Sequence, residues 1–330
     1  MVIFVQVRED LVYELRATHD VSPQDETYKI MKPHALKKGD TIGIAASSSP
    51  FDRNEFHQGV KALELLGFKV YYRKDIFDKK HYLAGSDQRR ADELLELIQN
   101  PDIKAVFFAR GGYGMVRLLP FLDRGTKGNK PKIVLGYSDI TSLLVHLYQR
   151  DGWVTFYGPV VAKDFCHLDD PTKNSFFQAV TRTKPLGPFV FRETECLKEG
   201  DCEGILVGGC LSLAVASLKT PYEINTDNKI LFLEDTNEKP YSVDRMLTQL
   251  VLAGKLKKVR GLLFGNFVNA GETAHYKETI LDVLHDFKGP ILFNFPAGHG
   301  PVKITLPLGI EARLTAHEKR LEFLEGACRD

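Results

Sequence analysis

The 330-residue sequence has few cysteines, and none of them form a C-x-x-C pair. Structural zinc sites are usually built on closely spaced cysteine pairs, and secreted disulfide scaffolds on dense, even sets of cysteines. This sequence therefore indicates a reducing compartment, and we expect a cytoplasmic protein. The five cysteines are Cys166, Cys196, Cys202, Cys210 and Cys328.

The sequence also lacks an excess of one charge and long apolar runs. It has 44 Lys and Arg against 43 Asp and Glu, so it has no bulk basic charge with which to bind nucleic acid. No apolar run approaches the roughly 18 residues that a membrane helix needs. The apolar start at residues 1–5 is too short for the core of a signal peptide. We therefore expect a globular protein with neither a nucleic-acid nor a membrane partner.

From Asp40 onward, short apolar runs alternate with amphipathic stretches. This alternation is typical of an α/β fold with a doubly wound, mostly parallel sheet, which we expect over residues 31–160. Residues 1–30 lack a clear period and are interpreted as an extension, with a docked strand or helix as the alternative. The predicted strands cover 41–46, 69–72, 105–109, 132–135 and 154–156, and the predicted helices cover 56–66, 86–98, 115–122 and a stretch from 140.

A second, smaller domain is predicted over residues 203–330. Residues 161–202 are rich in Pro, Lys and Asp without sustained periodicity, and they are interpreted as a linker. The second domain begins with a strand over 204–207 that meets a Gly-Gly turn. Further strands are expected over 230–233 and 261–264, a helix over 241–253 and a hairpin over 303–314.

Ser138 lies at the junction of a predicted strand and a predicted helix. A serine at such a junction is close to the free amides of a helix N-terminus, which can stabilise an oxyanion. The hydrolase pattern G-x-S-x-G is incomplete here, because Ile140 replaces its second glycine. Ser138 could be a nucleophile, or Ser138 or Asp139 could simply cap the helix.

A glycine turn, Arg110-Gly-Gly-Tyr-Gly114, follows the preceding predicted strand. Its spacing matches neither a dinucleotide fingerprint nor a P-loop. Taken alone, it is typical of a structural turn. Beside Ser138, a backbone N–H of Gly111 or Gly112 could act as a second oxyanion donor.

Two residues of the second domain complete a possible catalytic set. Glu234 directly follows an apolar strand, and His299 lies in a loop rich in Gly and Pro. Histidine is the usual general base near neutral pH, and a carboxylate can fix its orientation. Taken singly, Glu234 is typical of a capping acid and His299 of a loop histidine, whereas His146 falls inside a helix and indicates packing. The order Ser138, Glu234, His299 is a workable order for a triad, with Glu238 as the alternative acid.

Six segments resemble, in order, those of the LD-carboxypeptidases, a serine peptidase family that also contains the microcin C self-immunity hydrolases. The resemblance extends over about residues 32–315. The segments are 36–45, 110–114, 136–141, 156–159, 233–235 with 240–241, and 298–299 with 306–309.

The resemblance implies a Ser-Glu-His triad at Ser138, Glu234 and His299. It also implies an oxyanion hole from backbone amides near Gly112 and Asp139, and neither a metal nor an organic cofactor. The implied fold is a flavodoxin-like domain followed by a smaller, β-rich α/β domain, assembled as a homodimer. The implied reaction hydrolyses an L-to-D amide bond and releases the terminal D-alanine of murein tetrapeptides in cytoplasmic cell-wall recycling.

Several points stay open at this level. A carboxypeptidase must hold a free carboxylate, and Arg110, next to Gly111, is the nearest guanidinium, although it could instead be a structural salt-bridge partner. Cys210 stands where the resemblance predicts Asn. One alternative function is an immunity-type hydrolase that cleaves an amide bond in a peptidyl-nucleotide and needs an aromatic wall for the base. Another is a small-molecule binding module without catalysis.

Overall fold

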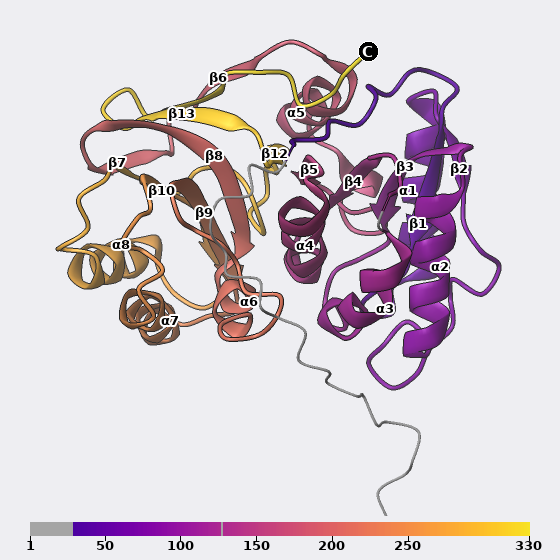
Figure 1. Cartoon of the computed structure of the whole chain (residues 1–330), viewed down its shortest axis with the longest axis horizontal. Coiled ribbons are helices and arrows are strands. Elements are labelled where there is room, and N and C mark those ends of the chain that lie inside the picture. The colour runs from indigo at the N-terminus through magenta and orange to yellow at the C-terminus, as the bar shows by residue number, and fades with distance from the viewer. Residues whose placement is uncertain (1–28, 127) are drawn as a thin grey trace, which may run out of the picture.

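The computed structural model describes residues 29–126 and 128–330, which form two β-sheets with helices (Figure 1). The predicted extension over residues 1–30 lies outside the described residues, apart from its last two. In the part that is described, no helix is both long enough and apolar enough to cross a membrane.

The first sheet has six strands in the order β12-β5-β4-β3-β1-β2. Its first five strands in sequence are parallel, whereas β12 pairs antiparallel with β5. The order β2-β1-β3-β4-β5 is that of a flavodoxin-like sheet, which confirms the predicted fold class. The strands are β1 (Thr41–Ala45), β2 (Lys69–Tyr71), β3 (Ile103–Phe108), β4 (Ile133–Gly136), β5 (Thr155–Tyr157) and β12 (Leu306–Leu308).

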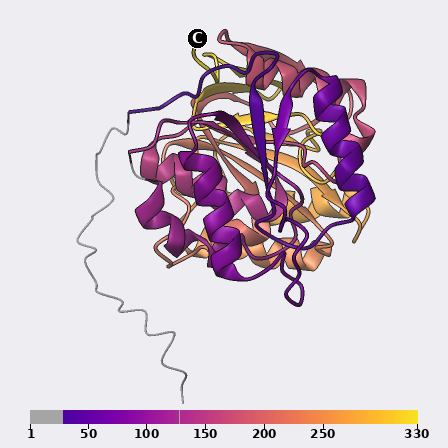
Figure 2. The same cartoon turned by 90° about the vertical axis from the view of Figure 1, so that its right-hand side faces the viewer.

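Helices flank this sheet (Figure 2), and some of their ends follow local capping signals. The Ser86 hydroxyl accepts a hydrogen bond from the Arg89 N–H at 3.2 Å, so α2 begins where the sequence predicts. Gly152 has a left-handed backbone and ends α4. The helices are α1 (Arg53–Leu65), α2 (Asp87–Gln99), α3 (Leu119–Gly125), α4 (Thr141–Asp151) and α5 (Asp170–Thr181).

The second sheet has eight strands in the order β6-β14-β13-β8-β9-β10-β11-β7. Its four central strands, β8 to β11, are parallel, and the outer strands pair antiparallel. Helices α6 (Leu211–Ala216), α7 (Pro240–Leu252) and α8 (Thr273–Val283) lie along one side of this sheet (Figure 1). The strands are β6 (Leu186–Val190), β7 (Glu195–Lys198), β8 (Asp201–Cys210), β9 (Lys229–Thr236), β10 (Gly261–Val268), β11 (Ile291–Phe293), β13 (Glu311–Thr315) and β14 (Arg320–Phe323).

The structure differs from the sequence prediction in two segments. Residues 161–202, predicted as a linker, contain α5 and also β6 and β7, the two edge strands of the second sheet. Edge strands are short and half-solvated, so their apolar period is weak. The predicted hairpin over 303–314 is instead divided: β12 joins the first sheet, β13 joins the second, and the hairpin is formed by β13 and β14.

One apolar core continues through both sheets. It contains Ile42 and Leu135 of the first sheet together with Leu206, Phe232 and Leu292 of the second. A second cluster fills the space between the second sheet and helices α6 to α8. The start of α4 is joined to the end of β8, because the Cys210 N–H donates to Thr141 Oγ1 at 3.1 Å. The carboxyl ends of β4 and β8 therefore face one another.

Candidate active site

Ser138 occupies a strained turn between β4 and α4. Its φ is +62°, a left-handed conformation that costs a residue with a side chain on the order of 1–3 kcal/mol. Two hydrogen bonds hold this turn: Thr141 Oγ1 donates to the Ser138 carbonyl at 2.7 Å, and the Ser138 N–H donates to Tyr157 Oη at 3.3 Å. The turn thus holds Ser138 at the carboxyl edge of the first sheet, where functional groups of such folds gather.

The capping alternative for Ser138 and Asp139 is wrong, because neither side chain caps α4 or the short 3₁₀ turn before it. The buried Asp139 carboxylate accepts hydrogen bonds from Ser48 Oγ at 2.6 Å and from the Met115 N–H at 2.7 Å. Burial raises the pKa of Asp139, although these hydrogen bonds oppose the shift. Asp139 therefore ties the loop after β1 and the glycine turn to the Ser138 turn.

The glycine turn packs directly against Ser138. A Cβ atom on Gly111 would lie 2.7 Å from the Ser138 Cβ, so only glycine allows this approach. Gly112 has a φ of +114°, and a Cβ atom there would lie 2.3 Å from Ser49 Oγ. Within residues 29–126 and 128–330, no hydrogen bond uses the backbone N–H of Gly112 or of Asp139. Both N–H groups are therefore without a hydrogen-bond partner among the described residues.

Glu234 and His299 form a direct pair. Strand β9 continues to Thr236, so Glu234 lies inside the strand rather than directly after it, and it is fully buried. His299 Nδ1 lies 2.8 Å from Glu234 Oε2, and the His299 backbone N–H donates to the same oxygen at 2.9 Å. A Cβ atom on Gly298 would lie 2.2 Å from that oxygen, so the loop needs glycine there. The carboxylate therefore fixes the imidazole orientation.

The alternative acid, Glu238, does not contact His299. It follows the end of β9, and its backbone carbonyl accepts a hydrogen bond from Tyr276 Oη at 2.8 Å. Of the two carboxylates considered from the sequence, the structure brings Glu234 to the imidazole.

Tyr157 joins the serine turn to the acid, a connection that sequence reasoning missed. Its hydroxyl donates to Glu234 Oε1 at 2.5 Å and accepts from the Ser138 N–H at 3.3 Å. Burial, and then the charge of Glu234, raise the pKa of Tyr157, so the hydroxyl remains a donor. The sequence signal was present, because Tyr157 ends an apolar strand within one of the six resembling segments.

The imidazole lies against the residue that precedes Ser138. The rings of Tyr137 and His299 are edge to face, with centroids 4.9 Å apart. Among the hydrogen bonds of the described residues, none joins Ser138 Oγ to His299. The structure thus brings Glu234 and His299 together and places the Ser138 turn beside them, without a hydrogen bond between the serine hydroxyl and the imidazole.

The expected Gly-Gly turn at 208–209 is instead part of β8, and it precedes Cys210. A Cβ atom on Gly208 would lie 1.9 Å from the Phe232 carbonyl oxygen, and one on Gly209 would lie 2.5 Å from the Thr141 Cγ2. The two glycines therefore let β8 approach β9 and α4. Cys210 pairs in register with Glu234, and its Sγ lies 3.4 Å from Glu234 Oε1. Burial raises the pKa of this thiol well above its usual range.

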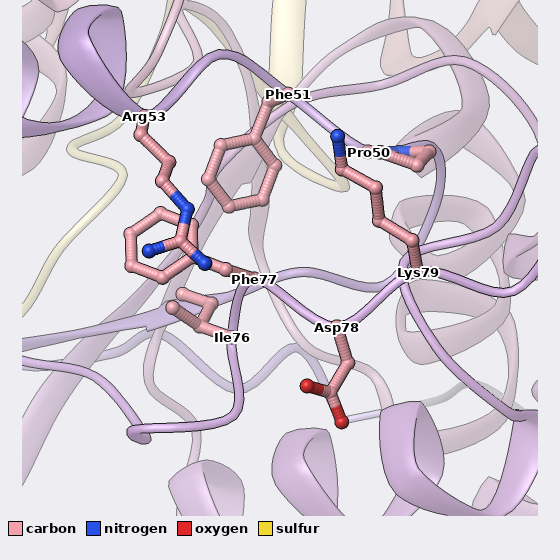
Figure 3. A pocket seen from close by; sticks show the side chains of 7 residues that line it. All are labelled: Pro50, Phe51, Arg53, Ile76, Phe77, Asp78 and Lys79. Atoms are coloured by element: carbon pink, nitrogen blue, oxygen red, sulfur yellow. The ribbon is translucent and has the colours of Figure 1, made fainter.

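Arg110 is exposed, and its guanidinium donates to the Pro50 carbonyl at 2.9 Å. It forms no ion pair with any residue that the structure describes, so the salt-bridge alternative has no support from these residues. Pro50 also lines a cavity of about 230 Å³, in which the Arg53 guanidinium lies over the Phe77 ring (Figure 3). None of Ser138, Glu234 and His299 lines this cavity.

A second cavity, of about 200 Å³, is lined in part by residues that follow His299. Pro301 and Lys303 line it, and Lys303 Nζ is 5.7 Å from the centroid of the Tyr137 ring. His146, which the sequence assigns to packing, is buried in α4, with Nε2 at 3.5 Å from Asp123 Oδ1.

Comparisons with known proteins match both halves of the chain. Residues 42–158 match the LD-carboxypeptidase N-terminal domain, and residues 203–314 match the LD-carboxypeptidase C-terminal domain. The probable murein peptide carboxypeptidase of Bacillus subtilis (strain 168) is 40% identical over 301 residues, covering 87% of this chain and 92% of that protein. The microcin C7 self-immunity protein MccF of Escherichia coli is 32% identical, covering 88% and 94%.

Solved structures show the same two relationships. MccF in complex with glutamyl sulfamoyl guanosine superposes with a TM-score of 0.84 at 28% identity, covering 91% of this chain and all of that one. The muramoyltetrapeptide carboxypeptidase from Oxalobacter formigenes superposes with a TM-score of 0.75 at 28% identity, covering 88% of this chain and all of that one.

Proposed function

Because this chain belongs to the LD-carboxypeptidase family, we propose that it is a serine carboxypeptidase that hydrolyses an L-to-D amide bond and releases the terminal D-alanine of murein tetrapeptides. The observation that carries this proposal is the buried Glu234–His299 pair beside the strained turn that holds Ser138. The 40% identity to a probable murein peptide carboxypeptidase supports the substrate class.

In the proposed mechanism, Ser138 Oγ attacks the scissile carbonyl while His299 Nε2 takes the hydroxyl proton. Glu234, at Nδ1, stabilises the imidazolium that forms. The N–H groups of Gly112 and Asp139 stabilise the oxyanion of the tetrahedral intermediate. The amide C–N bond then breaks, His299 gives its proton to the leaving amine, and water hydrolyses the acyl-enzyme with His299 again as base.

The mechanism requires a hydrogen bond from the Ser138 hydroxyl to His299 Nε2 in the substrate complex. Catalytic hydrogen bonds are often long before substrate binds and tighten in the Michaelis complex. Arg110 supports recognition of the substrate carboxylate, because it is exposed, without an ion-pair partner among the described residues, and adjacent to Gly111.

The test is release of free D-alanine from a murein tetrapeptide. Ser138→Ala should lower kcat by about 10⁴-fold or more, because the nucleophile is lost. Glu234→Gln should lower kcat by at least about 100-fold, because the imidazolium loses its buried counter-charge. Glu238→Gln is the matched control, since that side chain does not contact His299, and it should retain most of the activity.

Three outcomes would contradict the proposal. Equal release by wild type and Ser138→Ala would reject the nucleophile. A larger loss from Glu238→Gln than from Glu234→Gln would reject the acid. Tetrapeptide binding without turnover, with Ser138→Ala changing neither, would support the binding-module alternative.

A second candidate function is an immunity-type hydrolase that cleaves a peptidyl-nucleotide. It is favoured by the higher TM-score to MccF, 0.84 against 0.75, whereas the identity to the murein peptide carboxypeptidase favours the first candidate. We give more weight to sequence identity, because proteins acting on either substrate share one fold, and fold similarity alone does not separate the two functions. An aromatic wall is available at Tyr82 and Tyr113, which are exposed with ring centroids 5.8 Å apart. Faster cleavage of a peptidyl-nucleotide than of tetrapeptide, lost in Tyr113→Ala, would establish this candidate.

We further propose that the enzyme acts in the cytoplasm, in cell-wall recycling, and as a homodimer. The five free thiols support a reducing compartment. Sedimentation equilibrium of the purified chain measures the assembly directly, and a single species of one chain mass would reject the dimer.

A further inference from the structure

A third side chain lies beside the Glu234–His299 pair. Cys210 Sγ is 3.4 Å from Glu234 Oε1, and one ligand atom from each of the three residues lies within 4.8 Å of the others. Among residues 29–126 and 128–330, no other group of His, Cys, Asp and Glu side chains meets this condition. We propose that Cys210, Glu234 and His299 form a binding site for Zn²⁺ or a similar thiophilic divalent cation, and that the bound metal inhibits the enzyme.

The three donors are those that zinc prefers. Zinc takes a thiolate at about 2.3 Å, an imidazole nitrogen at about 2.0–2.1 Å and a carboxylate oxygen at about 2.0–2.2 Å. At tetrahedral angles these bonds put the donor atoms about 3.3–3.6 Å apart. Sγ and Oε1 are 3.4 Å apart, and Nδ1 lies 2.8 Å from Oε2 and 3.1 Å from Oε1. The carboxylate is therefore near the required spacing from both other donors, and the thiol and imidazole donors lie within 4.8 Å of one another.

The backbone holds the donors in place before any metal binds. Cys210 and Glu234 are partners in the parallel pairing of β8 and β9, so their side chains are neighbours on the sheet. The His299 N–H donates to Glu234 Oε2 at 2.9 Å, which fixes the histidine loop against the carboxylate. Tyr157 Oη donates to Glu234 Oε1 at 2.5 Å, and this hydrogen bond orients the carboxylate.

Metal binding would remove the catalytic arrangement. The cation replaces the thiol proton, so the S–H bond gives way to an S–metal bond and the proton passes to water. The imidazole binds through Nδ1 in the tautomer that carries its proton on Nε2. That tautomer cannot accept the Ser138 proton at Nε2, and Glu234 no longer holds Nδ1. Inhibition therefore follows from the same contacts that would hold the ion, and it is distinct from a requirement for a metal cofactor.

The experiment titrates Zn²⁺, and separately Cd²⁺, into the full-length, chelator-treated protein. The expected result is one tightly bound ion, a Cd–thiolate absorption band and loss of tetrapeptide cleavage, all reversed by EDTA. Cys210→Ser should reduce the Cd–thiolate absorbance by the contribution of one thiolate. It should also weaken metal binding at least about 100-fold. The metal concentration that half-inhibits Cys210→Ser should rise by the same factor, with the metal-free activity of that variant as the reference.

Cys328→Ser is the matched control, because Cys328 is also buried but, among the described residues, its Sγ hydrogen-bonds to the carbonyl oxygens of Ala179 and Val180 and to no carboxylate or imidazole. It should keep the band, the affinity and the inhibition of wild type.

If Cys210→Ser keeps the band and the affinity, the site is wrong. If it loses the band but is inhibited at the wild-type concentration, the inhibitory role is wrong. Cys210→Asn is the second variant should Cys210→Ser fail to fold. The Cd²⁺ band and the binding stoichiometry need no substrate, so they remain decisive even if the tetrapeptide is not cleaved.

Discussion

At the residue scale, the buried Glu234 carboxylate is the side chain on which the other candidate groups converge. Its two oxygens accept from the His299 N–H and from Tyr157 Oη, and both face the His299 ring. A buried carboxylate needs such donors, because an unsatisfied buried charge costs several kcal/mol. The contacts that offset the desolvation cost of Glu234 therefore also orient the imidazole.

Tyr157→Phe tests the connection between the acid and the serine turn. The substitution removes a donor to Glu234 Oε1 and the acceptor of the Ser138 N–H. Leaving buried groups unsatisfied costs about 1–3 kcal/mol, so kcat should fall about 10- to 100-fold. The KM for tetrapeptide should change little, because Tyr157 is a positioning residue that acts through Ser138 and Glu234. Steady-state kinetics on tetrapeptide would separate the two constants.

Tyr148→Phe is the control for this substitution. Tyr148 lies half-buried in α4, and no residue that the structure describes is a hydrogen-bond partner of its hydroxyl. It should leave kcat within about twofold of wild type. A loss in KM alone for Tyr157→Phe, or equal losses for both variants, would contradict the positioning role.

At the scale of elements, the end of β8 decides how the two sheets meet. Gly208 and Gly209 have φ values of +135° and +145° and lie in the strand instead of in a turn. Without side chains they allow β8 to contact the Phe232 backbone on one side and Thr141 of α4 on the other. The approach of Cys210 and Glu234 to the Ser138 turn depends on these two glycines.

Gly208→Ala should be strongly destabilising. Its new Cβ would lie 1.9 Å from a backbone oxygen, so β8 and β9 must separate, and we expect a loss of about 4 kcal/mol or more in the free energy of unfolding. Gly39→Ala is the control, since Gly39 also has positive φ but a Cβ atom there would have no atom within 4 Å, and it should cost about 1–2 kcal/mol. Urea denaturation measures both, and similar losses would show that backbone strain alone, and not the contact, determines the cost.

At the scale of the whole molecule, the two sheets share one apolar core, in addition to the separate cluster that packs the second sheet against α6 to α8. Residues of both sheets belong to one apolar cluster, and β12, from the C-terminal part of the chain, forms an edge of the first sheet. Near the end of the chain, the Arg329 N–H donates to the Pro33 carbonyl at 2.9 Å. The C-terminal segment therefore stabilises the N-terminal sheet.

We predict that the chain unfolds in one cooperative transition, although its length alone would favour two. The single tryptophan, Trp153, is fully buried beside the first sheet, so its fluorescence reports on that part of the fold, and far-UV circular dichroism reports on both. The two urea curves should coincide. Leu308→Ala, in β12, should lower the urea midpoint of both curves equally. The free energy of unfolding should fall by about 2–5 kcal/mol. Separated transitions would show that the two halves unfold independently.

Much of this arrangement could be predicted from the sequence because it depends on local signals. The alternation of apolar runs predicted a doubly wound, mostly parallel sheet, the resemblance implied that it is flavodoxin-like, and Ser86 predicted the start of α2. The segments resembling LD-carboxypeptidases pointed to the family that both domain matches show. The order of Ser138, Glu234 and His299 along the chain stays a prediction of catalytic roles, with the Glu234–His299 contact as its structural support.

The sequence by itself determined the sheet of the first half, because strand period, helix caps and short connections act over a few residues. Only the tertiary structure decided the rest: that residues 161–202 supply two edge strands, that β12 crosses to the first sheet, and that Tyr157 and Cys210 contact Glu234. Those contacts join residues 77 and 24 positions apart, and such pairings leave no local pattern. They depend on how two sheets pack around one core, a free energy to which the whole chain contributes.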